Sequence, residues 1–179
     1  MRYSILVAAF VGALTASPSA AQRPVSLGLA GGASIPTGEL REGADVGWHA
    51  LATIVISSLM QPLGLRLDVA YNRFSFKDGV PALADEYQAT GSATLNFTYR
   101  LPMTNSPMSP YLISGLGAYR TDCSLATGCE ASTRYGWNVG LGTKLYVLGF
   151  RSFLEARYHR TERGDTDVNF FPVTFGLVF

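Results

Sequence analysis

Two short stretches of the sequence carry an arginine and a carboxylate two residues apart, Arg66 with Asp68 and Glu155 with Arg157. Residues two apart in an extended strand project from the same face, so each pair can interact directly. Because charges removed from water need partners, such pairs suit a confined interior. The sequence therefore predicts an internal polar network made of Arg66, Asp68, Arg100, Lys144, Glu155 and Arg157. A packed set of ion pairs and hydrogen bonds is the favoured interpretation, and a narrow gated conduit is the alternative.

His159 is the one residue that suggests catalysis, because an imidazole can act as a general base toward a neighbouring nucleophile. The interpretation we favour is that a lone histidine on a polar strand face forms hydrogen bonds inside the fold. His49 and His159 are the only histidines, so a zinc site is not expected. We predict no cofactor, no metal and no enzymatic activity.

Cys123 and Cys129 are separated by five residues in a stretch rich in turn-forming residues. In an exported chain this spacing suggests a disulfide that closes a small surface loop. Such a ring would stabilise the fold by about 2–3 kcal/mol, mainly by restricting the unfolded loop. The closed loop could also present a contact surface to a partner.

The first 21 residues have the three parts of a cleavable export signal. A basic start precedes an apolar core at residues 5–14, and Ser19 and Ala21 provide the small residues of a cleavage site before Gln22. That core is too short to span a bilayer, which needs roughly 20 residues. We therefore expect residues 1–21 to be a signal peptide and residues 22–179 to form one domain.

From residue 22 onward the recurring hydrophobic period is two rather than 3.6 residues, which is typical of strands. The clearest case is residues 87–101, where Leu95 and Phe97 alternate with Thr94 and Asn96. The same alternation predicts eight strands, near 24–35, 45–57, 63–75, 86–101, 110–121, 133–147, 152–161 and 168–179. Most of these segments are much longer than the roughly five or six residues usual for globular strands.

Short and long connections alternate between these strands. The short ones fall at residues 58–62, 102–109 and 148–151, and the longer ones at 36–44, 76–85, 122–132 and 162–167. Of the 13 acidic residues, only Asp68 and Glu155 fall inside predicted strands away from the strand ends, and the rest lie in or beside the longer connections. These features predict an all-β fold, namely an eight-stranded antiparallel up-and-down transmembrane β-barrel with short turns at one end.

Alternation alone does not show which face of the sheet points outward. A solvated outer face would favour Lys and Glu, yet the polar faces carry small residues such as Ser26, Ser34 and Gly140, which suit a crowded interior. Aromatic residues assigned to the outward faces gather near strand ends, as two membrane-interface belts would. They are Trp48, Tyr71, Tyr87, Tyr119, Tyr135, Trp137, Tyr158 and Phe171 near the longer connections, and Tyr99, Tyr111 and Phe179 near the short ones. A soluble periplasmic barrel that binds a ligand is the alternative.

The last predicted strand ends on an aromatic residue and places Phe171, Val173, Phe175, Leu177 and Phe179 on one face. This pattern resembles the carboxy-terminal β-signal of Gram-negative outer-membrane proteins, which the outer-membrane assembly machinery reads. Further resemblance lies in the Gly-Trp-Asn-Val-Gly-Leu-Gly stretch at 136–142 and the Glu-Ala-Arg-Tyr stretch at 155–158. With the export signal and the eight strands, the chain resembles the small outer-membrane β-barrel family that includes OmpX, the OmpA barrel domain and the opacity-type proteins.

The resemblance implies a bacterial outer-membrane location with both termini in the periplasm. It also implies contact with outer-membrane lipids and lipopolysaccharide and, during biogenesis, with the assembly machinery. Some barrels of this size deacylate lipid A with a His-Ser pair late in the chain. Here Thr161 stands where that pair has its serine, and His159 has the inward parity, so a lipid A acyl hydrolase is the weaker alternative.

Charge and size narrow the remaining function classes. The 14 Lys and Arg residues nearly balance the 13 Asp and Glu residues, and no basic patch stands out, so a nucleic-acid partner is not expected. An eight-stranded barrel has an interior just wide enough for side chains to fill, which argues against a wide aqueous pore. We therefore expect an integral outer-membrane protein with a structural or surface-interaction role.

Overall fold

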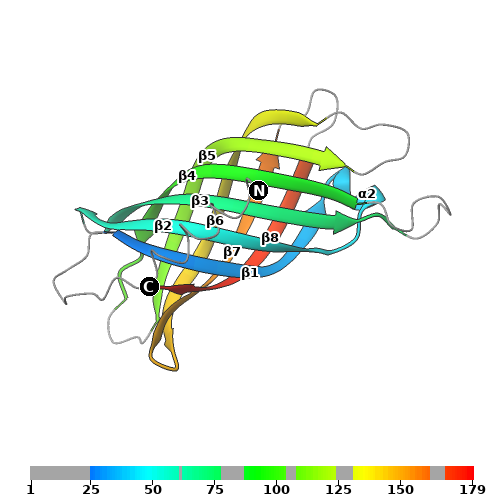
Figure 1. The fold of residues 1–179 in the computed structure, drawn as a ribbon. Helices are drawn as coiled ribbons and strands as arrows, with labels where there is room; N and C mark the ends of the chain where they lie inside the picture. The colour runs from blue at the N-terminus through cyan, green and yellow to red at the C-terminus, as the bar shows by residue number, and fades with distance from the viewer. Residues whose placement is uncertain (1–24, 61, 78–86, 104–107, 124–130, 162–167) are drawn as a thin grey trace, which may run out of the picture.

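The computed structural model describes residues 25–60, 62–77, 87–103, 108–123, 131–161 and 168–179 (Figure 1). The expected signal peptide at residues 1–21 lies outside these ranges, as does Cys129. The described elements are β1 (Val25–Thr37), α2 (Leu40–Gly43), β2 (Gly47–Met60), β3 (Leu63–Ser75), β4 (Tyr87–Arg100), β5 (Ser109–Cys123), β6 (Ser132–Val147), β7 (Phe150–Thr161) and β8 (Val168–Val178).

The eight strands form one closed barrel. Each strand pairs antiparallel with the next along the chain, and β8 returns to pair with β1. In Figure 1 the strands run obliquely around a common axis, as closure of a sheet into a barrel requires. The eight-stranded antiparallel up-and-down barrel expected from the sequence is thereby confirmed. Within the described ranges, no helix is long and apolar enough to cross a bilayer.

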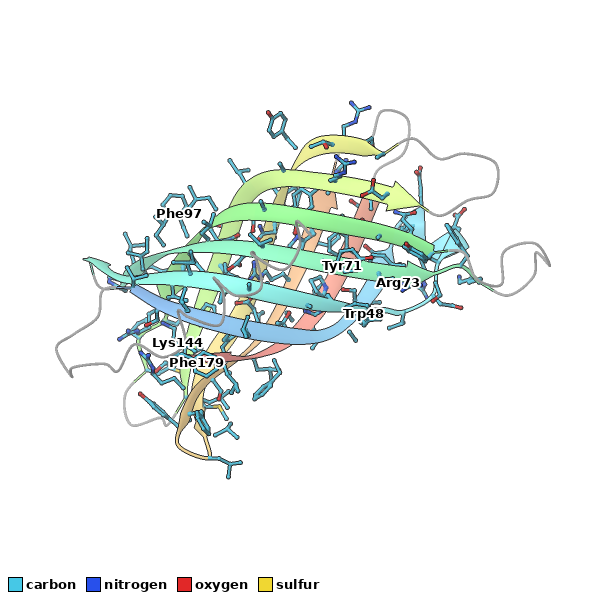
Figure 2. All side chains as sticks on the ribbon, viewed as in Figure 1. Trp48, Tyr71, Arg73, Phe97, Lys144 and Phe179 are labelled. Carbon is cyan, nitrogen blue, oxygen red and sulfur yellow. The ribbon has the colours of Figure 1, made fainter. Side chains whose placement is uncertain are left out.

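The barrel is polar inside and apolar outside. Along β4, Thr94 and Asn96 are buried in the interior, whereas Leu95 and Phe97 face outward and Phe97 is 61% exposed (Figure 2). A water-soluble barrel would bury its apolar face instead. A broad apolar outer surface over strands that each pair with a neighbour on both sides is the arrangement that a bilayer accommodates.

The turn between β6 and β7 is tighter than the four-residue connection expected from the sequence. Val147 pairs with Phe150, so only Leu148 and Gly149 lie between the strands. Both have positive φ, 51° and 82°, which is the conformation of a two-residue hairpin turn whose twist matches its strands. The sequence does not predict this turn, because Leu148 occupies the first turn position, where Asn or Asp is usual.

Two aromatic residues assigned to the outer belts lie inside the barrel instead. Tyr111 and Tyr119 on β5 are 3% and 1% exposed, and Leu112 and Leu116 occupy the outward positions. Glycines on the neighbouring strand β6 provide the room: a Cβ atom at Gly142 would lie 2.5 Å from the Tyr111 ring. The prediction was wrong because β5 has apolar residues on both faces, so alternation could not fix its parity.

Candidate functional site

Four charged side chains from opposite walls of the barrel meet in its interior. Arg66 and Asp68 come from β3, Glu155 and Arg157 from β7, and all four are buried. The strands β3 and β7 are four places apart in a barrel of eight, so the contacts between them cross the full width of the lumen. Each arginine therefore also contacts a carboxylate that lies 89 residues away in the sequence.

The four charges alternate in sign around a closed ring, which we call the lumen ring (Arg66, Asp68, Arg157 and Glu155). Arg66 Nε donates to Asp68 Oδ1 at 2.8 Å, and Arg66 Nη1 donates to Glu155 Oε2 at 2.8 Å. Arg157 Nη2 donates to Asp68 Oδ2 at 2.7 Å, and Arg157 Nε closes the ring by donating to Glu155 Oε1. Each carboxylate faces two guanidinium groups and each guanidinium faces two carboxylates, so the ring has no net charge. This alternation supplies the partners that buried charges require.

Neutral side chains use the remaining hydrogen-bonding capacity of the ring. Tyr111 donates its hydroxyl hydrogen to Glu155 Oε2 at 2.6 Å, and Asn96 Nδ2 donates to Asp68 Oδ2 at 3.0 Å. Asn138 Nδ2 in turn donates to Asn96 Oδ1 at 2.8 Å. The sequence did not predict that these three residues belong to the internal network. The available signal was their inward parity, which alternation predicts for Asn96 and Asn138 but not for Tyr111.

Two of the six residues expected in the network lie outside it. Arg100 and Lys144 have the inward parity but stand at the short-turn ends of β4 and β6, where both are exposed. The contact of the Lys144 ammonium is with the face of the Tyr111 ring, 6.0 Å from its centroid. The parity of Arg100 and Lys144 predicts that they point inward. Their distance from the lumen ring along the barrel axis depends on the register between strands, which parity does not predict.

A second polar layer lies toward the long-loop end of the barrel. Ser34 Oγ donates to Asn72 Oδ1 at 2.7 Å and lies 3.3 Å from His49 Nδ1. His49 Nε2 is 2.9 Å from Thr174 Oγ1. These four residues come from β1, β2, β3 and β8, so hydrogen bonds tie neighbouring strands together above the lumen ring. Among the residues described, no group of three or more His, Cys, Asp or Glu side chains could hold a metal ion.

The long-loop end of the interior is occupied by an apolar group, which we call the cap cluster. Its members are Ala44, Phe74, Tyr119, Val168 and Phe170, with Leu40 of α2 packed against them. Phe74 meets Phe170 edge-on at 5.8 Å between ring centroids. Phe74 and Phe170 have inward parity, so apolar side chains interrupt the polar face at this level.

His159 belongs to the packing of the cap cluster. Its ring stacks on Phe170 with centroids 4.9 Å apart, and its Nδ1 lies 3.0 Å from the Tyr119 hydroxyl oxygen. Thr161, two residues further on, donates its hydroxyl hydrogen to the backbone carbonyl of Val168 at 3.0 Å. The structure thus orients His159 by an aromatic stack and a phenol, inside the barrel and away from the outer apolar surface.

The outer surface carries aromatic pairs near the long-loop ends of the strands. Trp48 and Tyr71 lie with ring centroids 5.8 Å apart on β2 and β3, and Trp137 and Tyr158 lie at the same separation on β6 and β7 (Figure 2 labels the first pair). The outward face of β8 carries Phe171, Val173, Phe175 and Leu177, and Phe179 follows directly after the strand; these are the residues of the expected β-signal. The expected disulfide cannot be placed, since Cys129 and the side chain of Cys123 fall outside the described part of the chain.

A closed barrel with a polar interior, an apolar outer surface and aromatic pairs at strand ends defines the class of integral membrane β-barrels. Residues 6–179 match the model of the outer membrane protein β-barrel domain family. The chain belongs to that family, and it is a protein of the bacterial outer membrane. Comparison with curated protein sequences finds no significant match.

Three solved structures illustrate the fold. Neisserial surface protein A is 17% identical over 87% of this chain and 96% of its own, with a TM-score of 0.67. The Yersinia pestis outer membrane protein Ail is 16% identical over 86% of this chain and 99% of its own, with a TM-score of 0.53. The N-terminal β-barrel domain of Pseudomonas aeruginosa OprF is 14% identical over 86% of this chain and 97% of its own, with a TM-score of 0.52. At these identities the likeness concerns the fold.

Proposed function

We propose that this outer-membrane barrel has a structural or surface-interaction role, with a lumen filled by side chains rather than open as a pore. The observation that carries the proposal is the lumen ring, since its ion pairs span the barrel from β3 to β7. The cap cluster fills the same interior nearer the long-loop end. Ions crossing the barrel would have to break buried ion pairs at one level and displace packed aromatic rings at another.

The proposed orientation has the longer loops at the cell surface and both termini in the periplasm, after removal of residues 1–21. Eleven of the 13 acidic residues lie in or beside the longer connections, so that end is strongly solvated. A disulfide between Cys123 and Cys129 would constrain one of these loops. Loops that project from a rigid barrel are the natural contact surface for partners.

Two related structures support a role at the surface. One relative is named a surface protein, and Ail is named the attachment invasion locus protein and was crystallised with the heparin analogue sucrose octasulfate. For this chain we propose lipopolysaccharide as the first neighbour of the outer end. Arg73 supports this, because it projects outward and its guanidinium stacks 4.0 Å from the Tyr87 ring centroid. Such stacking uses the face of the guanidinium and not its N–H donors, which suit lipid phosphates.

Cysteine labelling tests the orientation and hence the surface role. Asp45→Cys places a thiol at the long-loop end, and Leu148→Cys places one in the β6–β7 turn at the other end. With a membrane-impermeant maleimide on intact cells, we expect labelling at position 45 and labelling at position 148 only after lysis, with the unmodified chain as baseline. The reverse pattern would contradict the proposal.

Analysis of lipid A tests the enzymatic alternative. Mass spectrometry of lipid A from cells with and without the protein should show no difference in acyl chains. Acyl loss that requires His159, shown by comparison with His159→Ala, would instead establish a lipid A hydrolase.

A further inference from the structure

Three cationic side chains stand at the short-turn end of the barrel, where the connections between strands carry no acidic side chain. Arg100, Lys144 and Arg151 are on the inward parity of β4, β6 and β7, close to the strand ends. The short connections at residues 61–62, 101–108 and 148–149 contain no acidic residue. Among the ion pairs found in the described part of the chain, none includes any of these three side chains.

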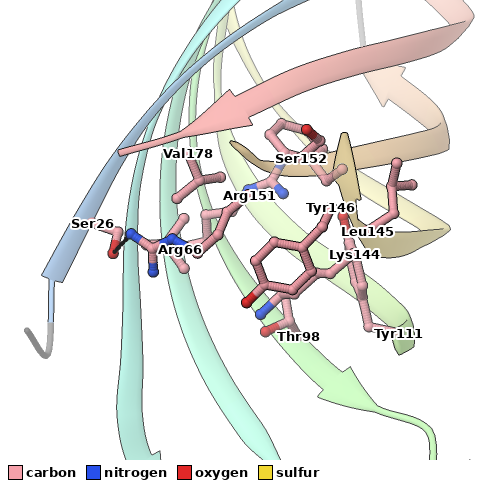
Figure 3. A pocket seen from close by; sticks show the side chains of 12 residues that line it. Ser26, Arg66, Thr98, Tyr111, Lys144, Leu145, Tyr146, Arg151, Ser152 and Val178 are labelled. Atoms are coloured by element: carbon pink, nitrogen blue, oxygen red, sulfur yellow. Dashed lines mark hydrogen bonds between the residues drawn. The ribbon is translucent and has the colours of Figure 1, made fainter. Parts of the chain in front are cut away.

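These cations line two adjoining hollows at the mouth of the barrel. The larger hollow, of about 110 Å³, is lined by Lys144 and Arg151 together with the hydroxyl-bearing residues Ser26 and Thr98, and by the ring of Tyr111, whose hydroxyl is bonded to Glu155 (Figure 3). The smaller one, of about 30 Å³, is lined by Arg100 and Lys144. Lys144 borders both, so one ammonium group connects the two spaces.

Among the described residues, the donors around these hollows have few acceptors. Arg151 Nη2 donates to Ser26 Oγ at the long distance of 3.5 Å, and the Lys144 ammonium faces the Tyr111 ring. The positive charges of Arg100, Arg66 and Arg151 repel the Lys144 ammonium. Like charges held together in a partly enclosed space repel one another, and a bound anion would offset that repulsion.

The position of the hollows along the barrel axis also indicates which ligand they can meet. Tyr99 and Phe179 face outward at this end of the barrel (Figure 2 shows Phe179 and Lys144 at the same end). Aromatic side chains on a membrane barrel mark the interface at which lipid headgroups lie. Arginine and lysine side chains with nearby hydroxyl donors are the groups that bind phosphate oxygens.

We propose that the short-turn mouth of the barrel binds a phosphate group through Lys144 and Arg151, with Arg100 at its edge. The phosphate belongs either to the headgroup of an anionic phospholipid or to free phosphate. The lumen ring forms the floor of the site through Arg66, whose guanidinium is already neutralised by Asp68 and Glu155.

The test uses the full-length processed protein, purified in a neutral detergent. Native mass spectrometry measures binding of phosphatidylglycerol and of phosphatidylcholine, and titration calorimetry measures binding of inorganic phosphate. The test variant is Lys144→Gln with Arg151→Gln, and Lys144→Gln alone is the second variant in case the pair does not fold. Arg134→Gln is the matched control, because Arg134 is an exposed arginine near the opposite end of β6. Heat-shifted gel mobility verifies the barrel in each sample.

We expect phosphatidylglycerol to bind in preference to phosphatidylcholine, and the double variant to weaken binding by about tenfold or more, as loss of one or two charge-assisted hydrogen bonds predicts. The Arg134→Gln control should bind like the unmodified protein. Binding of phosphatidylglycerol without binding of inorganic phosphate would identify a lipid headgroup as the ligand, and binding of both would show that phosphate alone suffices. Absence of binding, or equal binding by the unmodified protein and the folded variants, would overturn the proposal.

Discussion

Replacement of Glu155 by glutamine should destabilise the barrel strongly. The Glu155 carboxylate accepts hydrogen bonds from both guanidinium groups of the lumen ring and from the Tyr111 hydroxyl. The amide keeps the shape of the side chain but removes its charge, so Arg66 and Arg157 are left with Asp68 as their one carboxylate. Breaking a buried ion pair by removal of one partner costs about 3–5 kcal/mol, because the remaining charge stays buried and uncompensated. We expect a loss of that size in the free energy of unfolding.

Urea unfolding of the protein in lipid vesicles measures this loss. Asp122→Asn is the matched control, since Asp122 pairs with Arg120 at 3.4 Å on the exposed surface, where an ion pair contributes at most about 1 kcal/mol. A second variant, Glu155→Gln with Arg157→Gln, restores neutrality to the ring and should lose less than the sum of its two single changes. If Glu155→Gln cost no more than Asp122→Asn, the lumen ring would not be a stabilising feature of the fold.

Three further changes test other parts of the structure. Gly142→Ala should lower the free energy of urea unfolding by about 1–3 kcal/mol, because the added methyl group overpacks against the Tyr111 ring. Gly43→Ala, with open space around it, should change little. Equal effects of the two changes would contradict this explanation. Leu116→Arg puts a charge at the centre of the outward face of β5 and should lower the free energy of unfolding in vesicles by about 2–4 kcal/mol. Leu148→Arg in the exposed turn should leave it nearly unchanged. Tolerance of both changes would argue against a lipid-facing surface. Deletion of Phe179 should lower the amount of barrel assembled in cells but leave folding into vesicles in vitro intact, and normal assembly in cells would exclude a β-signal that includes this residue.

Alternation along the sequence was sufficient to predict the eight strands and the inward direction of the lumen ring. Asp68 and Glu155 are the only acidic residues within predicted strands away from the strand ends. Each has an arginine two residues away, so their pairing within a strand followed from local geometry. The contacts between β3 and β7 did not follow, because they depend on the stagger of eight strands around the barrel. The same limitation explains why Arg100 and Lys144 were grouped with residues that lie deeper in the lumen.

Packing, rather than polarity, decided the positions that the sequence did not predict. Tyr111 and Tyr119 turned inward where glycines on β6 leave space. Phe74 and Phe170 place apolar rings at the long-loop end of the interior, where a polar-in, apolar-out rule predicts polar residues. Their inward parity was readable from the sequence, since an aromatic residue on the polar face of a strand departs from the pattern around it.

Single-channel recording in a planar bilayer tests the filled lumen most directly. The processed protein is reconstituted at a density at which each membrane holds several barrels, and heat-shifted gel mobility verifies that they are folded. A lumen blocked by the ring and the cap cluster predicts a baseline current without discrete steps across the usual range of voltages. Reproducible conductance steps that disappear in Arg66→Ala or Glu155→Ala would show an ion path through the ring and would contradict the account.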